Sequence, residues 1–418
     1  MNTTKAKPFS ISKKEIWDAF LRVKANAGAA GIDKVSIAEF ERNLKDNLYL
    51  LWNRMSSGSY FPPPVRAVAI PKKAGGERIL GIPTVADRIA QTVVKLRLEP
   101  IVERVFHQDS YGYRPAKSAH QAIDVTRRRC WKHDWVLEFD IKGLFDNIDH
   151  NLLLKALCKH TDCRVTLLYV RRWLKASLVH EDGSTQAREK GTPQGGVISP
   201  ILANLFMHYA FDMWMSREHP QAPFARYADD GLVHCRTRAE AESIYLLLKQ
   251  RLGSCGLELH PTKTKIVYCK DSDRRGDDRN VTFDFLGFTF RPRGSKNKYT
   301  GKIFTNFTPA VSQSAQKAMR NTIRKWGIRT RNDKNLSDLA RMFNPILRGW
   351  ISYYGKFYPS GLYPIIRYFN LTLRHWAMKK YRRFRNRKTQ ASKWLQEVCK
   401  KQPKLFAHWN NGMNGGFG

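Results

Sequence analysis

Two adjacent aspartates, Asp229 and Asp230, interrupt an otherwise apolar stretch of the chain, RYADDGLVHCR at residues 226–236. The segments FARY and GLVHC that flank them have the composition of short β-strands, so the stretch predicts a hairpin with acids at its tip. Adjacent carboxylates repel each other, which raises the pKa of one of them unless a cation shares the site. The feature is therefore either an ordinary acidic turn or a place where a cation binds.

The composition favours a nucleic acid as the partner. The 418 residues include 73 lysines and arginines against 36 acids, a net charge of +37, and 42% of the residues are hydrophobic. A chain of this length predicts two or three domains with buried cores, and a protein this basic needs a polyanion to compensate its charge. An acidic membrane surface is the weaker alternative. No apolar run approaches the ~20 residues that span a bilayer. The N-terminal segment also lacks the apolar core of a secretory signal.

The cysteines indicate neither a zinc module nor a disulfide framework. All seven are scattered along the chain, and no C-x-x-C pair occurs. Buried free thiols in a reducing, cytoplasmic compartment are the simplest interpretation.

Positive charge is concentrated toward the C-terminus. Residues 291–418 contain 28 lysines and arginines against three acids. The segment FDFLGFTFRPRGSKNKYTGK (283–302) is predicted to be a linker, with a domain boundary near 295–310. Beyond it, residues 336–357 and 369–388 have the spacing of amphipathic helices, with aromatic and basic side chains interleaved. This pattern suits phosphate contacts and base stacking, although a helical bundle with a solvated basic face is the alternative for any one helix. The tail from 408 onward is predicted to be loose.

A second acidic position complements the pair in the hairpin. In DWVLEFDIKGLFDNIDH (134–150) the apolar residues alternate, which predicts a strand with Asp140 on the face opposite Leu137 and Phe139. Asp140 and Asp229 on neighbouring strands could share two Mg²⁺ ions about 3.5–4 Å apart, the arrangement that supports in-line phosphoryl transfer. Carboxylates suit Mg²⁺ because it prefers hard oxygen ligands. The sequence therefore predicts a metal site in the hairpin.

Several segments resemble, in order, the sequence blocks of reverse transcriptases. They are AGAAGIDKVS, AIPKKAGGERILGIPTVADRIAQ, SYGYRPAKSAHQAI, FDIKGLFDNIDH, GTPQGGVISPILANLF, RYADD, GLELHPTKTKI and FDFLGFTF. Downstream, LRGWISYYGKF resembles the thumb, or maturase, segment of group II intron-encoded proteins. Over roughly residues 20–410 the chain is similar to bacterial group II intron reverse transcriptase/maturases. Past residue 390, Cys399 and His408 are the only cysteine and histidine, too few for a zinc module. The H-N-H endonuclease domain of many relatives is therefore not expected.

The resemblance implies an α+β, right-hand polymerase with fingers and an antiparallel-sheet palm, followed by an α-helical thumb (maturase X domain). The expected divisions are an N-terminal extension at 1–60, fingers and palm at 61–295, and the thumb at 296–385. Residues 386–418 would form a short basic segment that could serve as a residual DNA-binding region.

The resemblance also implies the metal ligands. Asp140, Asp229 and Asp230, together with the backbone carbonyl of Ile141, would hold two catalytic Mg²⁺ ions, with Mn²⁺ as a substitute. Asp140 and Asp229 are the strongest candidates, because Asp230 could point away from the metals.

Five residues are expected around the nucleotide. They are the hairpin cations Lys72 and Arg78, the aromatic Phe145, which would exclude a ribose 2′-hydroxyl, Gln194, and Lys263 near the leaving pyrophosphate. A solvated hairpin tip is the alternative for the first two, core packing for Phe145, and Lys265 is a competing candidate for the role of Lys263.

Template and RNA contacts are expected elsewhere. Arg114 would contact the template or pack within the fingers. The expected nucleic-acid-binding residues of the thumb region are Lys379, Lys380, Arg382, Arg383 and Arg385.

The function implied is that of an RNA-directed DNA polymerase, a nucleotidyltransferase of a mobile retroelement. It would act on intron RNA as a splicing maturase and in retrohoming by target-primed cDNA synthesis, with a DNA primer or target and dNTPs as further partners, no membrane and no zinc. A cytoplasmic, ribonucleoprotein-associated bacterial protein is expected. The alternatives are a domesticated relative in DNA repair or phage defence, and an RNA-binding splicing factor without polymerase activity.

Overall fold

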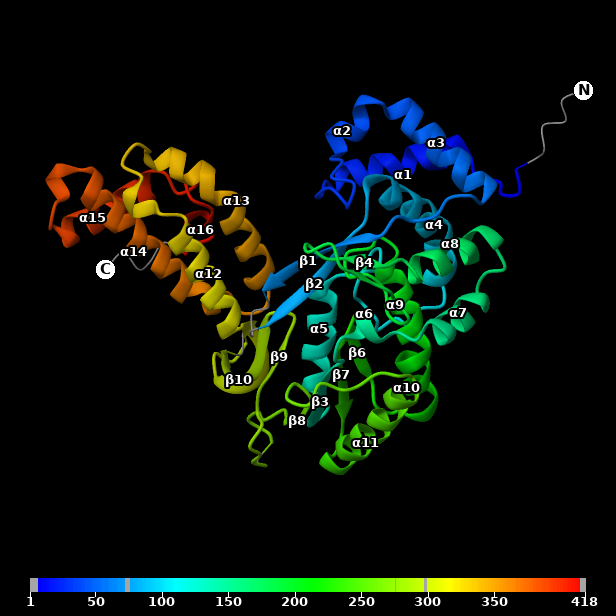
Figure 1. Ribbon diagram of the computed structural model, residues 1–418. Coiled ribbons are helices and arrows are strands. Elements are labelled where there is room, and N and C mark those ends of the chain that lie inside the picture. Colours follow the sequence, from blue (N-terminus) through cyan, green and yellow to red (C-terminus); the bar gives the residue numbers. More distant parts are fainter. Residues whose placement is uncertain (1–6, 72–75, 275, 297–298, 414–418) are drawn as a thin grey trace, which may run out of the picture. The chain divides into compact units, whose positions relative to one another are not determined.

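The computed structural model describes residues 7–71, 76–274, 276–296 and 299–413. The chain divides into two compact units that are each built from two segments (Figure 1). Unit 1 consists of Met1–Ala122 and Leu137–Ile266, and unit 2 consists of Ile123–Val136 and Val267–Gly418. Each unit mixes helices with antiparallel strand pairs, as the α+β prediction requires.

Unit 1 combines helices with two small sheets. Its helices are α1 (Lys13–Ala25), α2 (Ile37–Arg42), α3 (Leu44–Ser57), α4 (Val85–Glu103), α6 (Leu144–Asn147), α7 (His150–Cys158), α8 (Arg164–Leu174), α9 (Ser199–Met207), the π-helical turn η1 (His208–Asp212), α10 (Met213–Glu218) and α11 (Arg238–Ser254). Its strands are β1 (Val65–Pro71), β2 (Glu77–Ile82), β4 (Leu178–Val179), β5 (Thr185–Gln186), β6 (Phe224–Tyr227) and β7 (Asp230–Cys235). The elements α5 (Ala119–Cys130), β3 (Trp135–Asp140) and β8 (Lys265–Tyr268) contain residues of both units.

The two sheets confirm the strands predicted around the acids and the basic hairpin. One sheet has the strand order β2-β1-β4-β5, with β1 and β2 antiparallel. The other has the order β6-β7-β3-β8, so the strand that ends at Asp140 lies beside the acidic hairpin. In that hairpin Tyr227 pairs with Asp230. Ala228 and Asp229 therefore form the turn, and Asp230 begins the second strand.

Helix α4 runs through the core of unit 1. The Thr84 side chain caps its N-terminus by accepting a hydrogen bond from the Asp87 amide, an arrangement that stabilises a helix by about 1 kcal/mol. Its apolar residues are almost fully buried, among them Ile89, Val93 and Val94. The capping box of α1, formed by Ser12 and Glu15, fixes the start of the neighbouring helix in the same way.

Unit 2 contains a three-stranded sheet and a helical part. Its elements are β9 (Phe283–Phe285), β10 (Phe288–Lys296), β11 (Ile303–Val311), α12 (Gln313–Lys325), η2 (Ile328–Thr330), α13 (Leu336–Tyr354), η3 (Pro359–Leu362), α14 (Tyr363–Lys380), η4 (Arg382–Phe384), α15 (Lys388–Lys401) and α16 (Ala407–Asn410). Helix α13 confirms the first amphipathic pattern read from the sequence, whereas α14 covers the second, at 369–388, only up to Lys380. No helix in the described ranges is long and apolar enough to cross a membrane.

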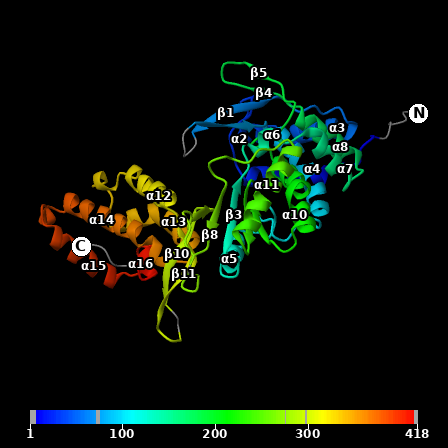
Figure 2. The ribbon, with the colours of Figure 1, turned by 90° about the horizontal axis from the view of Figure 1, so that it is seen from below.

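The predicted linker at 283–302 is wrong. Most of it forms β9 and β10, and β10 pairs with β11 over nine residues, from Phe288 opposite Val311 to Lys296 opposite Ile303. Figure 2 shows these two strands running side by side. The aromatic alternation of FDFLGFTF explains the error, because Phe283, Phe288 and Phe290 form a buried face that the Gly, Pro and Lys content obscured.

The predicted loose tail is also wrong for the residues that the structure describes. His408, Trp409 and Met413 are buried in the core of unit 2, where they extend a cluster that includes Phe369 and Trp376. The Asn344 side chain accepts the Ala407 amide at 2.9 Å, and the His408 ring bonds the Asn370 side chain at 2.7 Å. Buried polar partners of this kind hold a segment in one place.

Candidate active site

The three aspartates singled out by the sequence meet in unit 1. Asp140 is the last residue of β3, Asp229 lies in the β6–β7 turn, and Asp230 begins β7. Since β7 and β3 are neighbours in the sheet, the turn reaches the end of β3, where the Ile141 amide donates to the Asp229 carbonyl at 3.3 Å. The structure therefore brings together the acids expected from two separate motifs.

The electrostatics of this cluster indicate a shortage of positive charge. Burial raises the pKa of Asp229, and the Asp140 carboxylate raises it further, while Arg78 and Lys263 oppose the rise. The pKa of Asp230 rises to about 7, first through burial and then through repulsion from Asp229 and Asp140. Carboxylates in such surroundings gain most from a bound cation.

In this structure a lysine supplies the nearest cation. The Lys263 ammonium donates to the Asp140 carboxylate at 2.9 Å, and this contact raises the pKa of the lysine. Across the described ranges no three acidic, histidine or cysteine side chains form a set that could hold a metal by themselves. Mg²⁺ does not need such a set, because it usually binds one or two carboxylates, several waters and the phosphates of a substrate. The donor chemistry therefore fits Mg²⁺ that arrives with a nucleotide.

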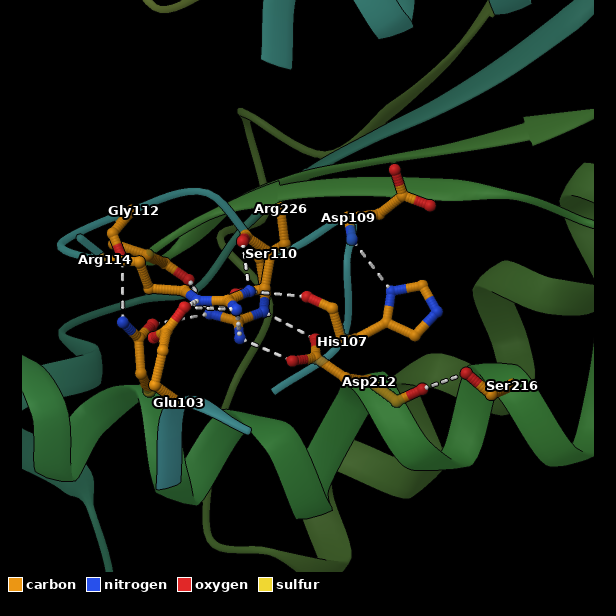
Figure 3. A network of polar contacts seen from close by, with 11 residues as sticks. Glu103, His107, Asp109, Ser110, Gly112, Arg114, Asp212, Ser216 and Arg226 are labelled. Atoms are coloured by element: carbon orange, nitrogen blue, oxygen red, sulfur yellow. Dashed lines mark hydrogen bonds and ion pairs between the residues drawn. The ribbon is translucent and has the colours of Figure 1, made fainter. Parts of the chain in front are cut away.

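A buried ion pair holds the acidic hairpin from behind (Figure 3). The Arg226 guanidinium, which is 0% exposed, donates to both carboxylate oxygens of Asp212 at 2.7 Å. It also donates to the Ser110 hydroxyl at 2.8 Å and to the Ala228 carbonyl at 3.0 Å. Arg226 thus connects the turn that presents Asp229 to the helical segment beneath it.

The turn is further restricted by its backbone. Ala228 has a φ of 60°, in the left-handed region that L-residues rarely occupy. Gly112 packs against it so closely that a Cβ there would lie 2.6 Å from the Ala228 nitrogen, and the Asn204 side chain donates to the Gly112 carbonyl at 2.7 Å. The sequence reasoning missed this support. A single arginine within an otherwise apolar strand was the available signal.

The predicted gate and the glycine-rich loop are adjacent. Phe145 lies in the short helix α6 and is 8% exposed, and its ring forms a T-shaped pair with that of Tyr113 at a centroid distance of 6.4 Å. The Thr192 amide donates to the Phe145 carbonyl at 2.6 Å, and Gln194 donates to the Asp146 carboxylate at 3.1 Å. Phe145 and Gln194 therefore belong to one local structure, whose nucleotide role stays a prediction.

Tyr113 is a residue that the sequence reasoning did not single out. Its φ is 56° and its side chain is more than half exposed. Burial of the hydroxyl raises its pKa, and the charge of Asp229 adds to the effect. Tyr113 therefore lies within electrostatic range of the carboxylates and in contact with the Phe145 ring.

The basic hairpin is only partly visible. Arg78 lies on the exposed part of β2, opposite Ile70, and its charge acts on both Asp229 and Tyr113. Lys72 lies outside the described residues.

The structure shows Arg114 in packing contacts, which supports the packing alternative, and a template contact stays a prediction. Its side chain is 5% exposed and pairs with Glu103 at 2.6 Å. It also donates to the carbonyls of His107 and Ser110 at 2.6 and 2.7 Å (Figure 3). These contacts engage the guanidinium inside unit 1.

The five basic residues expected to bind nucleic acid in unit 2 differ in their surroundings. The Lys380 ammonium donates to the carbonyls of Asn332 and Lys334, both at 2.8 Å. The other four are exposed: Lys379, Arg382, Arg383 and Arg385. Lys380, by contrast, is of intermediate exposure and contacts backbone carbonyls.

Comparison with known families identifies both parts of the chain. Residues 70–290 match the family described as "Reverse transcriptase (RNA-dependent DNA polymerase)". Residues 316–394 match the "Group II intron, maturase-specific domain". The first match contains all the acids of the cluster, and the second contains most of the helices of unit 2.

Individual relatives agree with these matches. The chain is 34% identical to protein YkfC of Escherichia coli over an alignment of 285 residues that covers 59% of this chain and 74% of YkfC. It is 36% identical to the group II intron-encoded protein LtrA of Lactococcus lactis over 209 residues, 48% of this chain but 33% of LtrA. A putative COX1/OXI3 intron 1 protein of Saccharomyces cerevisiae is 29% identical over 215 residues, 51% of this chain and 25% of that protein. The chain belongs to the reverse-transcriptase family and carries, in addition, a match to the group II intron maturase-specific domain.

Proposed function

We propose that unit 1 catalyses RNA-templated DNA synthesis at the cluster of Asp140, Asp229 and Asp230. The observation that carries the proposal is the meeting of these acids at the edge of one sheet, with raised pKa values at two of them. An acidic cluster of this kind in a chain of net charge +37 is suited to bind a cation between the protein and a polyanion.

Asp140, Asp229 and Asp230 and the Ile141 carbonyl would hold two Mg²⁺ ions, for which Mn²⁺ could substitute. The ions supply charge stabilisation to the attacking and leaving oxygens of phosphoryl transfer. Asp140 must then exchange its Lys263 partner for a metal. The Lys263 ammonium contacts the Asp140 carboxylate in this structure. After the exchange it would stay beside the metal site and would be free to bind the phosphates of the nucleotide.

Other residues of unit 1 would bind the nucleotide. Arg78, together with Lys72 of the same hairpin, would contact the triphosphate. Arginine suits bidentate phosphate contact, and lysine supplies a point charge. Phe145 would exclude a 2′-hydroxyl by its bulk, and Gln194 would lie beside the incoming nucleotide.

In this proposal unit 1 corresponds to fingers and palm, and the helical part of unit 2 to the thumb and maturase domain. The exposed basic side chains of α14 and of the turn after it, Lys379, Arg382, Arg383 and Arg385, would contact intron RNA. DNA primers and dNTPs complete the set of partners. Splicing assistance and target-primed cDNA synthesis would then use the two units for different steps within one ribonucleoprotein.

Primer extension tests the polymerase proposal. The wild type and Asp229→Asn are compared on an RNA template with a DNA primer, dNTPs and Mg²⁺, and RNA binding by both is measured in parallel. The expected result is extension by the wild type, its loss in the variant by on the order of 10³-fold, and equal RNA affinity. Equal extension by both proteins would refute the assignment of Asp229. A wild type that binds RNA without extending primers would favour splicing assistance as the sole activity.

A further inference from the structure

The loop that carries Gln194, residues 191–198, is held from three sides. The Gly191 and Thr192 amides donate to the carbonyls of Ile148 and Phe145, at 2.7 and 2.6 Å. The Gly81 amide of β2 donates to the Gln194 carbonyl at 2.8 Å. The third support comes from a side chain, which makes it separable by mutation.

That side chain is Gln91 of α4, which is 2% exposed. Its Oε1 accepts the amides of Val197 and Ile198, at 2.7 and 3.3 Å. Gly196 packs against the same group, since a Cβ there would lie 3.3 Å from the Gln91 Oε1. The position of the Gln91 oxygen therefore determines where this end of the loop can lie.

The other end of the Gln91 amide is bound to a buried carboxylate. Its Nε2 donates to Asp87 Oδ2 at 2.9 Å. Asp87, itself 1% exposed, accepts two further bonds at Oδ1, from the Tyr60 hydroxyl at 2.8 Å and the Trp173 indole at 2.7 Å. Both carboxylate oxygens of Asp87 therefore act as acceptors. Burial raises the pKa of this carboxyl, and the hydrogen bonds from Trp173, Tyr60 and Gln91 oppose the rise.

We propose that Gln91 is a positioning residue for the nucleotide-binding loop, and that Asp87 fixes the orientation of its amide. The inference rests on the proposed polymerase function, because it gives Gln194 a nucleotide to contact. Gln91 supports the loop from behind and would contact neither the metals nor the substrate.

The Gln91 amide group is asymmetric, with an acceptor at one end and two donors at the other. Rotating the Gln91 amide by 180° would place Nε2 against the Val197 amide and Oε1 against the Asp87 carboxylate. Both contacts would then be repulsive, and buried donors would be left without acceptors. A buried carboxylate without a cation is unfavourable by itself. The Asp87 carboxylate nevertheless selects one orientation of the Gln91 amide, and the amide in turn fixes one position of the loop.

Three variants distinguish the hydrogen bonds from Asp87 through Gln91 to the loop from an effect of packing alone. Gln91→Met keeps the size of the side chain but removes both hydrogen bonds. Asp87→Asn does not touch the loop. Its Oδ1 would be kept by the Tyr60 and Trp173 donors, so its Nδ2 would face the Gln91 Nε2 and oppose it. The double variant Asp87→Asn/Gln91→Glu restores the match, because the introduced amide at 87 can donate to the introduced carboxylate at 91, which still accepts the loop amides.

Each single variant should raise the KM for dNTP by about tenfold, with a smaller change in kcat, since the loop contacts the nucleotide. The double variant should recover most of the loss. Hydrogen exchange of the Val197 and Ile198 amides, which requires no activity, should accelerate in both single variants and slow again in the double variant.

Thr92→Val is the matched control. It removes a buried hydrogen bond of the same helix, from the Thr92 hydroxyl to the Arg88 carbonyl at 2.7 Å, so it should lower thermal stability without changing the KM for dNTP. The inference is overturned if the variants at Asp87 and Gln91 lower thermal stability without changing the KM for dNTP, as Thr92→Val should. It is also overturned if hydrogen exchange of the Val197 and Ile198 amides changes while the KM for dNTP does not. A wild type that extends no primer would overturn the proposed function and the nucleotide role together, and that outcome is recognised from the wild-type reaction alone.

Discussion

Two hairpins of this molecule have the same backbone pattern and opposite charge. The hairpin of β6 and β7 in unit 1 is short and mostly buried, with Asp229 in its turn. The hairpin of β10 and β11 in unit 2 pairs nine residues, and its distal half is largely exposed. Residues 288–311 contain no acid, and the cations of that hairpin in the described residues are Arg291, Arg293, Lys296 and Lys302.

The comparison shows how each hairpin tolerates its charges. Arg226 of the acidic hairpin and Asp212 beneath it are buried and neutralise each other. The carboxylates of the turn therefore need an external cation. In the basic hairpin Arg293 is half-buried, donates to the carbonyls of Thr308 and Thr289, and has its pKa lowered to about 10 by burial and by the charge of Arg291. The first arrangement favours a metal as partner, and the second favours a polyanion.

The largest expected effect concerns the ion pair beneath the acidic hairpin. Asp212→Leu should lower the free energy of unfolding by about 3–5 kcal/mol, because it leaves the Arg226 guanidinium buried without its carboxylate. Chemical denaturation with urea measures this change.

The double variant Arg226→Met/Asp212→Leu sharpens the test. Replacing both charges with apolar side chains should recover much of the stability, while extension remains impaired because the Ala228 carbonyl loses its donor. Recovery of full activity in the double variant would show that the pair supports the fold but not the position of Asp229.

The next prediction is that the charge of the basic hairpin serves RNA binding. Neutralising Arg291, Lys296 and Lys302 to glutamine should weaken affinity for structured RNA by on the order of 10- to 100-fold and reduce the salt slope by about 2–3. Titrations between 50 and 200 mM salt measure both quantities.

A control triple variant carries the same loss of charge in unit 1, at the exposed Lys155, Lys175 and Lys249. If it weakens RNA binding as much as the hairpin variant, net charge decides the affinity and the hairpin has no special role.

Metal binding should depend on pH in a defined direction. Because the folded, metal-free protein raises the pKa of Asp230 to about 7, the proton-linked stability of this group is present at low pH and is lost as pH rises through 7. Mg²⁺ competes with that proton, so its apparent affinity should be about tenfold weaker at pH 6 than at pH 8. The shift of Tm with Mg²⁺ at the two pH values reports this difference. Asp230→Asn should remove it, whereas an unchanged shift in that variant would exclude Asp230 as the titrating group.

The smallest effect distinguishes two adjacent lysines. Lys380→Met should lower the free energy of unfolding by about 1–2 kcal/mol, since its ammonium holds the carbonyls of Asn332 and Lys334. Lys379→Met should leave stability unchanged and weaken RNA binding slightly. Reversed results for the pair would contradict the distinction between an internal and an exposed cation.

Local sequence patterns were sufficient for the acidic hairpin and for the strand that ends at Asp140. Both depend on alternation over a few residues, and the structure places the acids together because the two strands are neighbours. The helices α13 and α14 were predictable for the same reason, since a regular spacing of apolar residues produces one buried face.

The supports of the site were not predictable in this way. Arg226 pairs with Asp212, which lies fourteen residues earlier in the chain. Gln91 accepts a hydrogen bond from the Val197 amide, 106 residues later. Such pairings depend on tertiary packing and leave no periodic signal. The β10–β11 hairpin was missed because its Gly, Pro and Lys residues resemble those of a flexible connection, although the buried phenylalanines of β10 fix its register.

The split composition of unit 2 constrains when that unit can form during synthesis. Its early segment, 123–136, contributes the Trp131 indole, which donates to the Phe307 carbonyl, and Asp134, which pairs with Arg274. These partners are made more than a hundred residues later, and the core is closed only when Trp409 and Met413 join it. Contacts so distant in sequence form slowly. A ribosome must therefore have translated residue 413 before the helices of unit 2 can reach their final packing, whereas unit 1 has all its residues once position 266 has been added.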